Sequence, residues 1–429
     1  MRTRFPWIVA IFALVAIGFL VACSTKYSAN SSTHALVVVP TQGTIEIPDE
    51  TAVMETFSIN LANGSASQIN NVNGPPTPGL PTAVILDPAG ANAYVIVHQN
   101  AELVPSQTGI TAFPIGSDGK LASGTTTTLN NTTGGVPVVP VALAMDSAGK
   151  FLFVADSSTN GLPGSVSVLA IGTGGSLTEL PDSPFPLPVE PGNQTASASA
   201  LAVTRTAYPI QYSACSGVTP PTTENLYVTD SVNYVLVNYS VDPSAGTLTL
   251  MPYSTSSPGI PTHQVPSGVA VDPCNQYVYV ANSLTNDVSA YSICSAINLL
   301  STPPCPSANF SLNQIPASPV HVNGGNSPGP IAVDAYGKFL YVVNPGSSNI
   351  AGYVINRSTG LITQSTAQPT VAAGLGANSI AIRSDDSWLF VANTNATNVS
   401  QYSITFSSGV LNPVGPINTL DLPSGVAVK

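Results

Sequence analysis

The chain has 429 residues, a formal net charge of −11 at pH 7 and only 7% charged residues. Such an acidic surface repels nucleic acids and anionic lipid headgroups, so neither is expected as a direct partner. Hydrophobic residues make up 43% of the chain, enough for a large core, and the Gly, Pro, Ser, Thr and Asn that fill the rest indicate a turn-rich β protein rather than a disordered one.

The amino terminus has the pattern of a bacterial export signal. Two arginines precede an apolar run from Trp7 to Ala22, which is short for a membrane-spanning helix. The sequence LVAC ending at Cys23 resembles the lipobox of lipoproteins, which implies cleavage before Cys23 and lipidation of its sulfur; an ordinary signal peptide or an uncleaved anchor is the alternative. We therefore predict a lipoprotein signal peptide over residues 1–22, a lipidated cysteine with a polar tether over 23–33, and a lipid-anchored location in the bacterial cell envelope (outer membrane, periplasmic or surface side).

Residues 34–429 contain a repeated unit. The stretch GKFLYVVNPGSSNIAGYVI from Gly337 recurs as QYVYVANSLTNDVSAYSI from Gln276 and as SWLFVANTNATNVSQYSI from Ser387. Each unit predicts a first strand of small and β-branched residues, an aromatic second strand, an alternating third and a fourth after a Gly turn. The first strands end, at spacings of 49 to 68 residues, at Asp87, Asp146, Thr204, Asp272, Asp334 and Arg383. Blades that converge on an axis need such a slim inner strand, and they bury their faces only against neighbours.

The strands at the two ends of this region are predicted to form one blade together. The chain finishes with LPSGVAVK, a first strand with nothing after it, whereas ALVVVP from Ala35 and METFSINLANGSASQI from Met54 are later strands with no first strand before them. Joining them makes a seventh blade and removes exposed sheet edges. The predicted fold is all-β, a seven-bladed β-propeller over residues 34–429, closed by the C-terminal strand joining N-terminal strands.

The pattern DxxGKFLYVxNxxxNxVxxYxIxxxTGxLT, clearest from Asp334 to Thr363, resembles the lactonase family of seven-bladed propellers, which includes 6-phosphogluconolactonase, and the YVTN-repeat surface proteins. The resemblance covers most of the mature chain. It implies the propeller fold, but it does not carry the family's activity over to this chain. The matching residues are the blade scaffold, so they specify the fold far more than the activity.

Strand alternation assigns every loop to one of two faces. We call the face where first strands begin the top face, and the face where they end the bottom face. The Asp that ends most first strands opens a bottom turn and is predicted to accept local backbone N–H bonds. Similar turn bonding is predicted for the top-face residues that end second strands, namely Asn282, Asn344, Asn393, Asp156 and Asp230.

The top loops hold the candidate site residues. Three histidines are candidate catalytic bases, because a His beside a carboxylate can activate water against a lactone carbonyl: His98, His263 and His321. Five top-face carboxylates are candidate binding residues: Glu102, Asp156, Glu190, Asp230 and Asp287. An oxyanion stabiliser would also be required. The alternative is that all of these are solvated loop residues at unrelated radii.

The basic residues all fall elsewhere. Those of the propeller are assigned to bottom loops: Lys120, Lys150, Arg205, Lys338, Arg357, Arg383 and Lys429. A phosphorylated sugar lactone held at the top would need cationic clamps, so the chain departs from a phosphogluconolactonase in this respect. The sequence has no nucleophile elbow, P-loop, dinucleotide-binding glycine pattern or HExxH, and no spacing typical of a zinc or calcium site. We expect no cofactor and no metal.

Four cysteines follow Cys23, and in an exported chain they predict two disulfides with three pairings to choose from. Cys215 and Cys274 fall in bottom loops of adjacent blades, whereas Cys294 and Cys305 bracket one Pro-rich loop between third and fourth strands. We therefore predict the pairs Cys215–Cys274 and Cys294–Cys305.

Three functional hypotheses follow. The leading one is an envelope-anchored, monomeric binding or scaffolding module for protein or glycan, favoured by the charge-poor repeat array, the predicted anchor and the polar Ser/Thr/Asn loops. The second is a lactonase-like hydrolase that acts on an uncharged lactone or ester at the channel mouth. The third, a cofactor-dependent dehydrogenase of propeller type, is disfavoured because the mature chain keeps one Trp, Trp388, and that residue lies in a predicted core strand.

Overall fold

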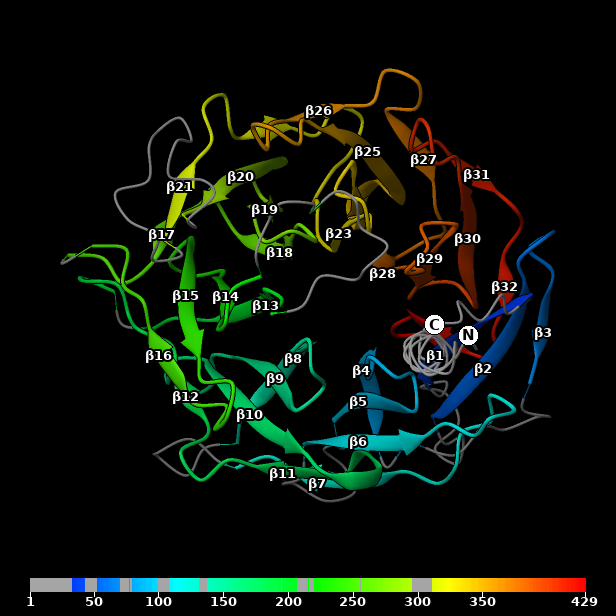
Figure 1. Ribbon diagram of the computed structural model, residues 1–429, viewed down its shortest axis with the longest axis horizontal. Helices are drawn as coiled ribbons and strands as arrows, with labels where there is room; N and C mark the ends of the chain where they lie inside the picture. Colours follow the sequence, from blue (N-terminus) through cyan, green and yellow to red (C-terminus); the bar gives the residue numbers. More distant parts are fainter. Residues whose placement is uncertain are drawn as a thin grey trace, which may run out of the picture.

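The computed structural model describes residues 33–429, apart from 43–51, 70–76, 78, 99–107, 131–136, 194, 207–214, 216–219, 255 and 295–310. Its described part forms seven antiparallel sheets in a closed ring (Figure 1), with the short 3-10 turns η1 (Thr173–Gly175) and η4 (Pro345–Ser347). The predicted seven-bladed propeller is confirmed. No helix in these ranges is long and apolar enough to cross a membrane. The predicted signal peptide and Cys23 lie outside the described residues.

Six blades are each formed by consecutive strands of the chain, which run in order from an inner first strand to the outer edge. Blade 1 has β4 (Leu80–Leu86), β5 (Asn92–His98), β6 (Gly109–Pro114) and β7 (Thr125–Thr128). Blade 2 has β8 (Val139–Met145), β9 (Phe151–Ser157), β10 (Ser165–Ile171), β11 (Leu177–Glu179) and β12 (Phe185–Pro186). Blade 3 has β13 (Ala198–Val203), β14 (Glu224–Asp230), β15 (Val235–Val241), β16 (Leu248–Leu250) and β17 (Ile260–Pro261).

The next three blades repeat this order. Blade 4 has β18 (Pro266–Val271), β19 (Tyr277–Asn282), β20 (Asp287–Ile293), β21 (Leu312–Gln314) and β22 (Val320–His321). Blade 5 has β23 (Ile331–Val333), β24 (Phe339–Asn344), β25 (Asn349–Ile355), β26 (Ile362–Gln364) and β27 (Thr370–Ala372). Blade 6 has β28 (Ala377–Ile382), β29 (Trp388–Asn393), β30 (Asn398–Ile404), β31 (Leu411–Pro413) and β32 (Ile417–Asn418). In blades 2 to 6 the outer edge is shared by two short strands, because the last one also pairs with the third strand.

Blade 7 closes the ring from both ends of the chain. It contains β1 (His34–Gln42), β2 (Val53–Asn60) and β3 (Ala66–Gln68), and its inner strand comes from β33 (Leu422–Pro423) and β34 (Ala427–Val428). Val37 lies opposite Val428, and Thr41 lies opposite Pro423. The predicted mixed-terminus closure is therefore confirmed.

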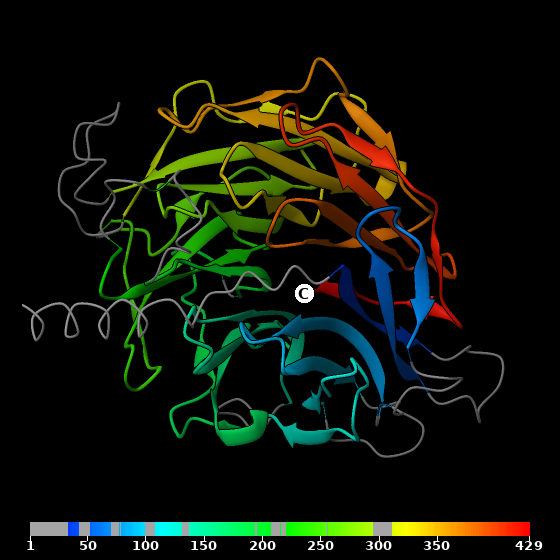
Figure 2. The ribbon, with the colours of Figure 1, turned by 45° about the vertical axis from the view of Figure 1, so that its right-hand side comes forward.

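The hydrophobic core is divided into clusters that lie between neighbouring blades. In β24, Phe339 and Tyr341 face blade 6, whereas the alternate residues Leu340 and Val342 face blade 4. Figure 2 shows the sheets packing face to face around the ring. Each aromatic second strand thus fills the gap on both of its sides, while the small first strands fit near the axis. No blade could bury its apolar surface alone.

The bottom turns form as predicted. Asp146 Oδ1 accepts the backbone N–H groups of Lys150 and Phe151 at 2.6 Å each, and Asp334 Oδ1 accepts those of Lys338 and Phe339 at 2.6 and 2.8 Å. A carboxylate used in this way stabilises the turn between the first and second strands. These recurring aspartates have a structural role.

The first predicted disulfide is present. Cys215 and Cys274 are bonded with their Cα atoms 5.4 Å apart, and they pack against Ala335 and Tyr336 of the next blade. Cys294 is also disulfide-bonded. Its predicted partner, Cys305, lies outside the described residues.

Candidate functional site

The top end of the central channel is shaped by a β-bulge repeated around the ring. In five blades the register between first and second strands shifts by one residue near the start of the first strand. A bulge leaves one residue unpaired and re-aims its side chain. Here the extra residues all line the channel: Thr82, Val141, Ser199, Ser267 and Asn378.

These residues enclose a cavity of about 510 Å³ at the top of the channel. None of the described residues that line it is charged. Several of its hydroxyls also connect blades, since Ser199 Oγ donates to the Pro266 carbonyl and Ser267 Oγ to the Pro328 carbonyl, each at 2.7 Å. The cavity therefore suits a neutral, polar molecule rather than an ion.

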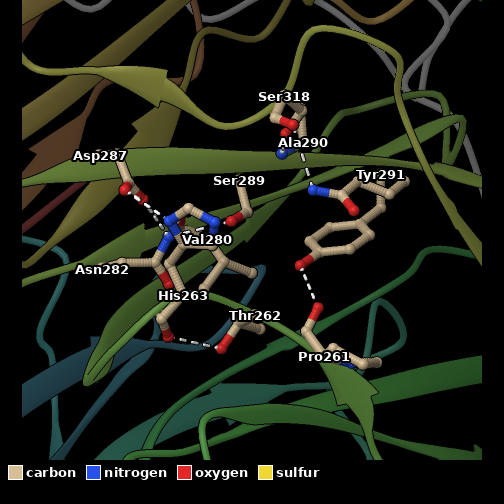
Figure 3. A network of polar contacts seen from close by, with 11 residues as sticks. Pro261, Thr262, His263, Val280, Asn282, Asp287, Ser289, Ala290, Tyr291 and Ser318 are labelled. Atoms are coloured by element: carbon tan, nitrogen blue, oxygen red, sulfur yellow. Dashed lines mark hydrogen bonds and ion pairs between the residues drawn. The ribbon is translucent and has the colours of Figure 1, made fainter. Parts of the chain in front are cut away.

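A histidine–carboxylate pair lies on the top face (Figure 3), further from the axis than the residues that line this cavity. His263, in the loop between β17 and β18, places Nδ1 2.7 Å from Oδ2 of Asp287, the first residue of β20. The Asp287 side chain is only 9% exposed, whereas that of His263 is 43% exposed. When Nδ1–H donates to the carboxylate, the neutral ring carries its lone pair on Nε2. The pair therefore offers a base at the surface with a buried carboxylate behind it.

A second hydrogen bond fixes the carboxylate. Asn282 Nδ2 donates to Asp287 Oδ1 at 2.7 Å and to Ser289 Oγ at 3.0 Å (Figure 3). Similarly, Asn344 Nδ2 donates to Asn349 Oδ1, and Asn393 Nδ2 to Asn398 Oδ1. The turn bonding predicted for Asn282, Asn344 and Asn393 is thus corrected, because these amides bridge to the first residue of the third strand.

The His263 loop is connected to the cavity through a strained residue. Val265 has a φ of 55°, which is unfavourable for a β-branched side chain, and blade 6 places Gly376 at the corresponding position with a φ of 71°. The Val265 carbonyl accepts the backbone N–H of Ser283 at 2.9 Å and its hydroxyl at 3.0 Å. Since Ser283 lines the cavity, the loop that carries His263 is attached to the channel mouth.

The other two candidate histidines have different surroundings. His321 pairs with Asp287 across β22 and β20, which places both side chains on one face of the sheet. His98 ends β5 on the far side of the ring from Asp287 (Figure 1), where burial lowers its pKa and a hydrogen bond to the Pro140 carbonyl opposes that shift. The structure therefore gathers His263 and His321 around Asp287 and leaves His98 apart.

Three of the candidate binding carboxylates are used inside the protein. Asp230 accepts the backbone N–H groups of Ser197 and Val232, and Glu190 accepts that of Gly259. Asp156 is buried, accepts the hydroxyls of Ser165 and Ser167, and has a pKa raised by burial to about 7. None of these three lines the channel cavity. Glu102 lies outside the described residues.

Basic side chains gather at the opposite end of the channel. Arg205 and Arg383 line a cavity of about 180 Å³ together with Asp334 and Asp386, and Lys429 Nζ donates to the Gly90 carbonyl of a bottom turn. In the described ranges, no three His, Cys, Asp or Glu side chains are arranged to hold a metal ion. Lys26 lies outside those ranges.

Comparison with known proteins agrees with this architecture. The family described as "Lactonase, 7-bladed beta-propeller" matches residues 296–429. Among solved structures, a "putative 6-phosphogluconolactonase" from Bacteroides fragilis has a TM-score of 0.68 and 16% identity, over 94% of this chain and 100% of that one. The periplasmic gluconolactonase of Pseudomonas aeruginosa has a TM-score of 0.66 and 16% identity, over 92% and 99%. No curated protein sequence matches the chain.

The fold defines the class as a seven-bladed β-propeller, and residues 296–429 match the lactonase family of such propellers. The predicted resemblance to that family is confirmed, by sequence over residues 296–429 and by fold over the described chain. At 16% identity the likeness to the solved structures concerns the fold alone.

Proposed function

We propose that this protein hydrolyses an uncharged lactone or a related ester at the top of its central channel, with His263 as general base. The observation that carries the proposal is the 2.7 Å contact between His263 Nδ1 and the buried Asp287 carboxylate. The lactonase family match and the gluconolactonase fold add support for this hypothesis over that of a binding scaffold.

The chemistry requires one water molecule and no other reactant. His263 Nε2 takes a proton from water while the water oxygen bonds to the lactone carbonyl carbon. The tetrahedral intermediate then breaks the bond between that carbon and the ring oxygen, which takes the proton from the imidazolium. The product is the open-chain hydroxy acid, and Asp287 stabilises the imidazolium through Nδ1–H.

The lining of the top cavity, which does not include His263 itself, defines the substrate class. Lys and Arg are absent from the described lining of the top cavity, so a phosphate group would find no cationic partner there. A neutral sugar lactone, by contrast, presents hydroxyls that match Thr82, Ser424 and Asn378. We therefore expect an unphosphorylated lactone.

Initial rates with a panel of sugar lactones and simple esters test this proposal, after subtraction of spontaneous hydrolysis. His263→Gln is expected to lower kcat by about 10²–10⁴-fold, as loss of a general base does, and Asp287→Asn by a smaller factor. His98→Gln is the matched control, because that residue lies away from the pair, and it should keep wild-type rates. Turnover that His263→Gln leaves unchanged would exclude this base.

The binding or scaffolding hypothesis, for protein or glycan, stays a prediction, as do the monomeric state, the lipid anchor and the envelope location.

A further inference from the structure

A second cavity, of about 570 Å³, lies at the outer rim between blades 6 and 7. Its walls are the β2–β3 hairpin on one side and the segment from β30 to β32 on the other, which meet at the right of Figure 1. It is separate from the central channel, because the two linings share no residue. We infer that this rim cavity binds a neutral, polyhydroxylated ligand such as the end of an oligosaccharide.

The chemistry of the lining carries the inference. Its described residues include five neutral polar side chains and no charged one: Asn63, Ser65, Gln68, Gln401 and Asn418. Amides and hydroxyls can both donate and accept, which matches the hydroxyl groups of a sugar. A volume of this size is in the range of small-molecule sites.

The side-chain amide of Gln401 uses only one of its two polar atoms in a hydrogen bond with the described residues. Its side chain is buried, with 5% of the residue exposed, and Nε2 donates to the Gly64 carbonyl at 2.7 Å. Oε1 is buried and has no partner among the described residues. A buried acceptor without a donor costs about 1–3 kcal/mol, so such a group calls for a bound donor. Because Gln401 lines the rim cavity, a small rotation of its amide toward the cavity would let a ligand hydroxyl supply that donor.

The cavity is specific to this junction. The equivalent third-strand position is occupied by Val168, Ala290 and Gly352 in blades 2, 4 and 5. In blade 4, moreover, Ser318 Oγ accepts the Ala290 N–H at 2.7 Å. In blade 6 the connection from Val414 to Ile417 is two residues shorter than that from Ile315 to Val320 and has no such serine. The shorter connection leaves the space into which Gln401 extends.

The opposite wall is held in place. Gly64 has a φ of 73°, and a Cβ there would lie 2.5 Å from Val414 Cγ1 and 2.7 Å from Trp388 Cη2. Only glycine therefore allows the hairpin tip to approach blade 6 this closely. Gln68 Nε2 donates to Glu55 Oε2 at 2.9 Å, so the neighbouring carboxylate is already occupied. The hairpin wall of the site is thus fixed before any ligand binds.

Saturation-transfer NMR and calorimetry on the full-length protein test the inference with four neutral disaccharides: maltose, cellobiose, lactose and N,N′-diacetylchitobiose. At least one should bind, with a Kd of about 1 mM. Gln401→Met and Ala66→Trp, which remove the amide and fill the cavity, should each weaken binding at least about tenfold. The matched control is Gln368→Met, because both ends of the Gln368 amide bond to Leu411, and this variant should bind normally.

Two results would overturn the inference: no binding of any of the four disaccharides at about 50 mM, or binding that Gln401→Met and Ala66→Trp leave intact. Neither of them depends on lactone hydrolysis, because the His263 site and the rim cavity share no residue.

Discussion

Asp156 places a carboxylate where blades 4 to 6 have Asn282, Asn344 and Asn393. The three asparagines are the last residues of their second strands and Asp156 is the last but one of β9; all four bond to the third strand, but only the aspartate can ionise. Its pKa is raised by burial to about 7, opposed by the Ser167 and Ser165 hydroxyls. The folded protein therefore holds a proton up to about pH 7 that the unfolded chain releases near its ordinary pKa of 3.8.

The raised pKa of Asp156 predicts how the stability of the folded protein depends on pH. Because the folded pKa lies above the unfolded one, the contribution of Asp156 to stability is present below about pH 4 and is lost as pH rises through about 7. Asp156→Asn should raise the free energy of unfolding by about 1–3 kcal/mol at pH 8, since its amide oxygen still accepts the two hydroxyls. Urea unfolding at pH 4 and pH 8 measures this. A gain of equal size at both pH values would contradict the account.

The backbone conformation of Val265 leads to a second prediction about stability. Its left-handed backbone conformation costs a β-branched residue about 1–2 kcal/mol, whereas Asn adopts it readily. Val265→Asn should therefore raise the free energy of unfolding by about 1 kcal/mol. Chemical denaturation of this variant beside Gly376→Val, which should lose stability, checks the expectation. A loss of stability in Val265→Asn would show that packing of the valine outweighs the strain.

Sequence reasoning identified His263 and Asp287 as separate candidates, yet it could not pair them. They are 24 residues apart, His263 in the loop that leads into blade 4 and Asp287 at the start of the third strand of that blade, and their contact depends on the path of this loop. The hydrogen bonds from Asn282 and its equivalents to the third strand were likewise not predictable from the sequence. The last residue of a second strand can bond either within its own turn or to the third strand, and only the folded structure shows which bond forms.

At the scale of elements, the strands were predictable and the bulges were not. The first strands end where the small and β-branched runs end, since period and size are visible in the sequence. A bulge adds one residue to a run without changing its composition, so nothing in stretches such as PTAVIL or PSGVAV marks it. The rim cavity was not predictable for a similar reason. It results from a connection between outer strands that is two residues shorter in blade 6 than in blade 4.

The Cys215–Cys274 disulfide joins two elements of adjacent blades across 59 residues. A crosslink over a loop of this length stabilises mainly by restricting the unfolded chain. Cys215→Ala with Cys274→Ala should lower the free energy of unfolding by about 2–4 kcal/mol. Urea denaturation of the double variant measures the loss, and a loss below about 0.5 kcal/mol would show that the bridge adds little to the packed blades.

At the scale of the whole molecule, the closed ring separates two chemistries. The bottom end of the channel has arginines and buried carboxylates, whereas the top end has a neutral cavity, and the His263–Asp287 pair lies further out on the same face. This division was predictable, because alternation alone assigns each loop to a face once the ring is closed. The depth and contents of the cavities were not, since they depend on side-chain packing near the axis.

The central claim is hydrolysis of an uncharged lactone by a base on the top face. The most direct test is kcat/KM for glucono-1,5-lactone and for its 6-phosphorylated counterpart, measured on the wild type and on His263→Gln. We expect the wild type to prefer the uncharged lactone by at least about tenfold and His263→Gln to lose this turnover. Preference for the phosphorylated lactone, or turnover that survives in His263→Gln, would contradict it.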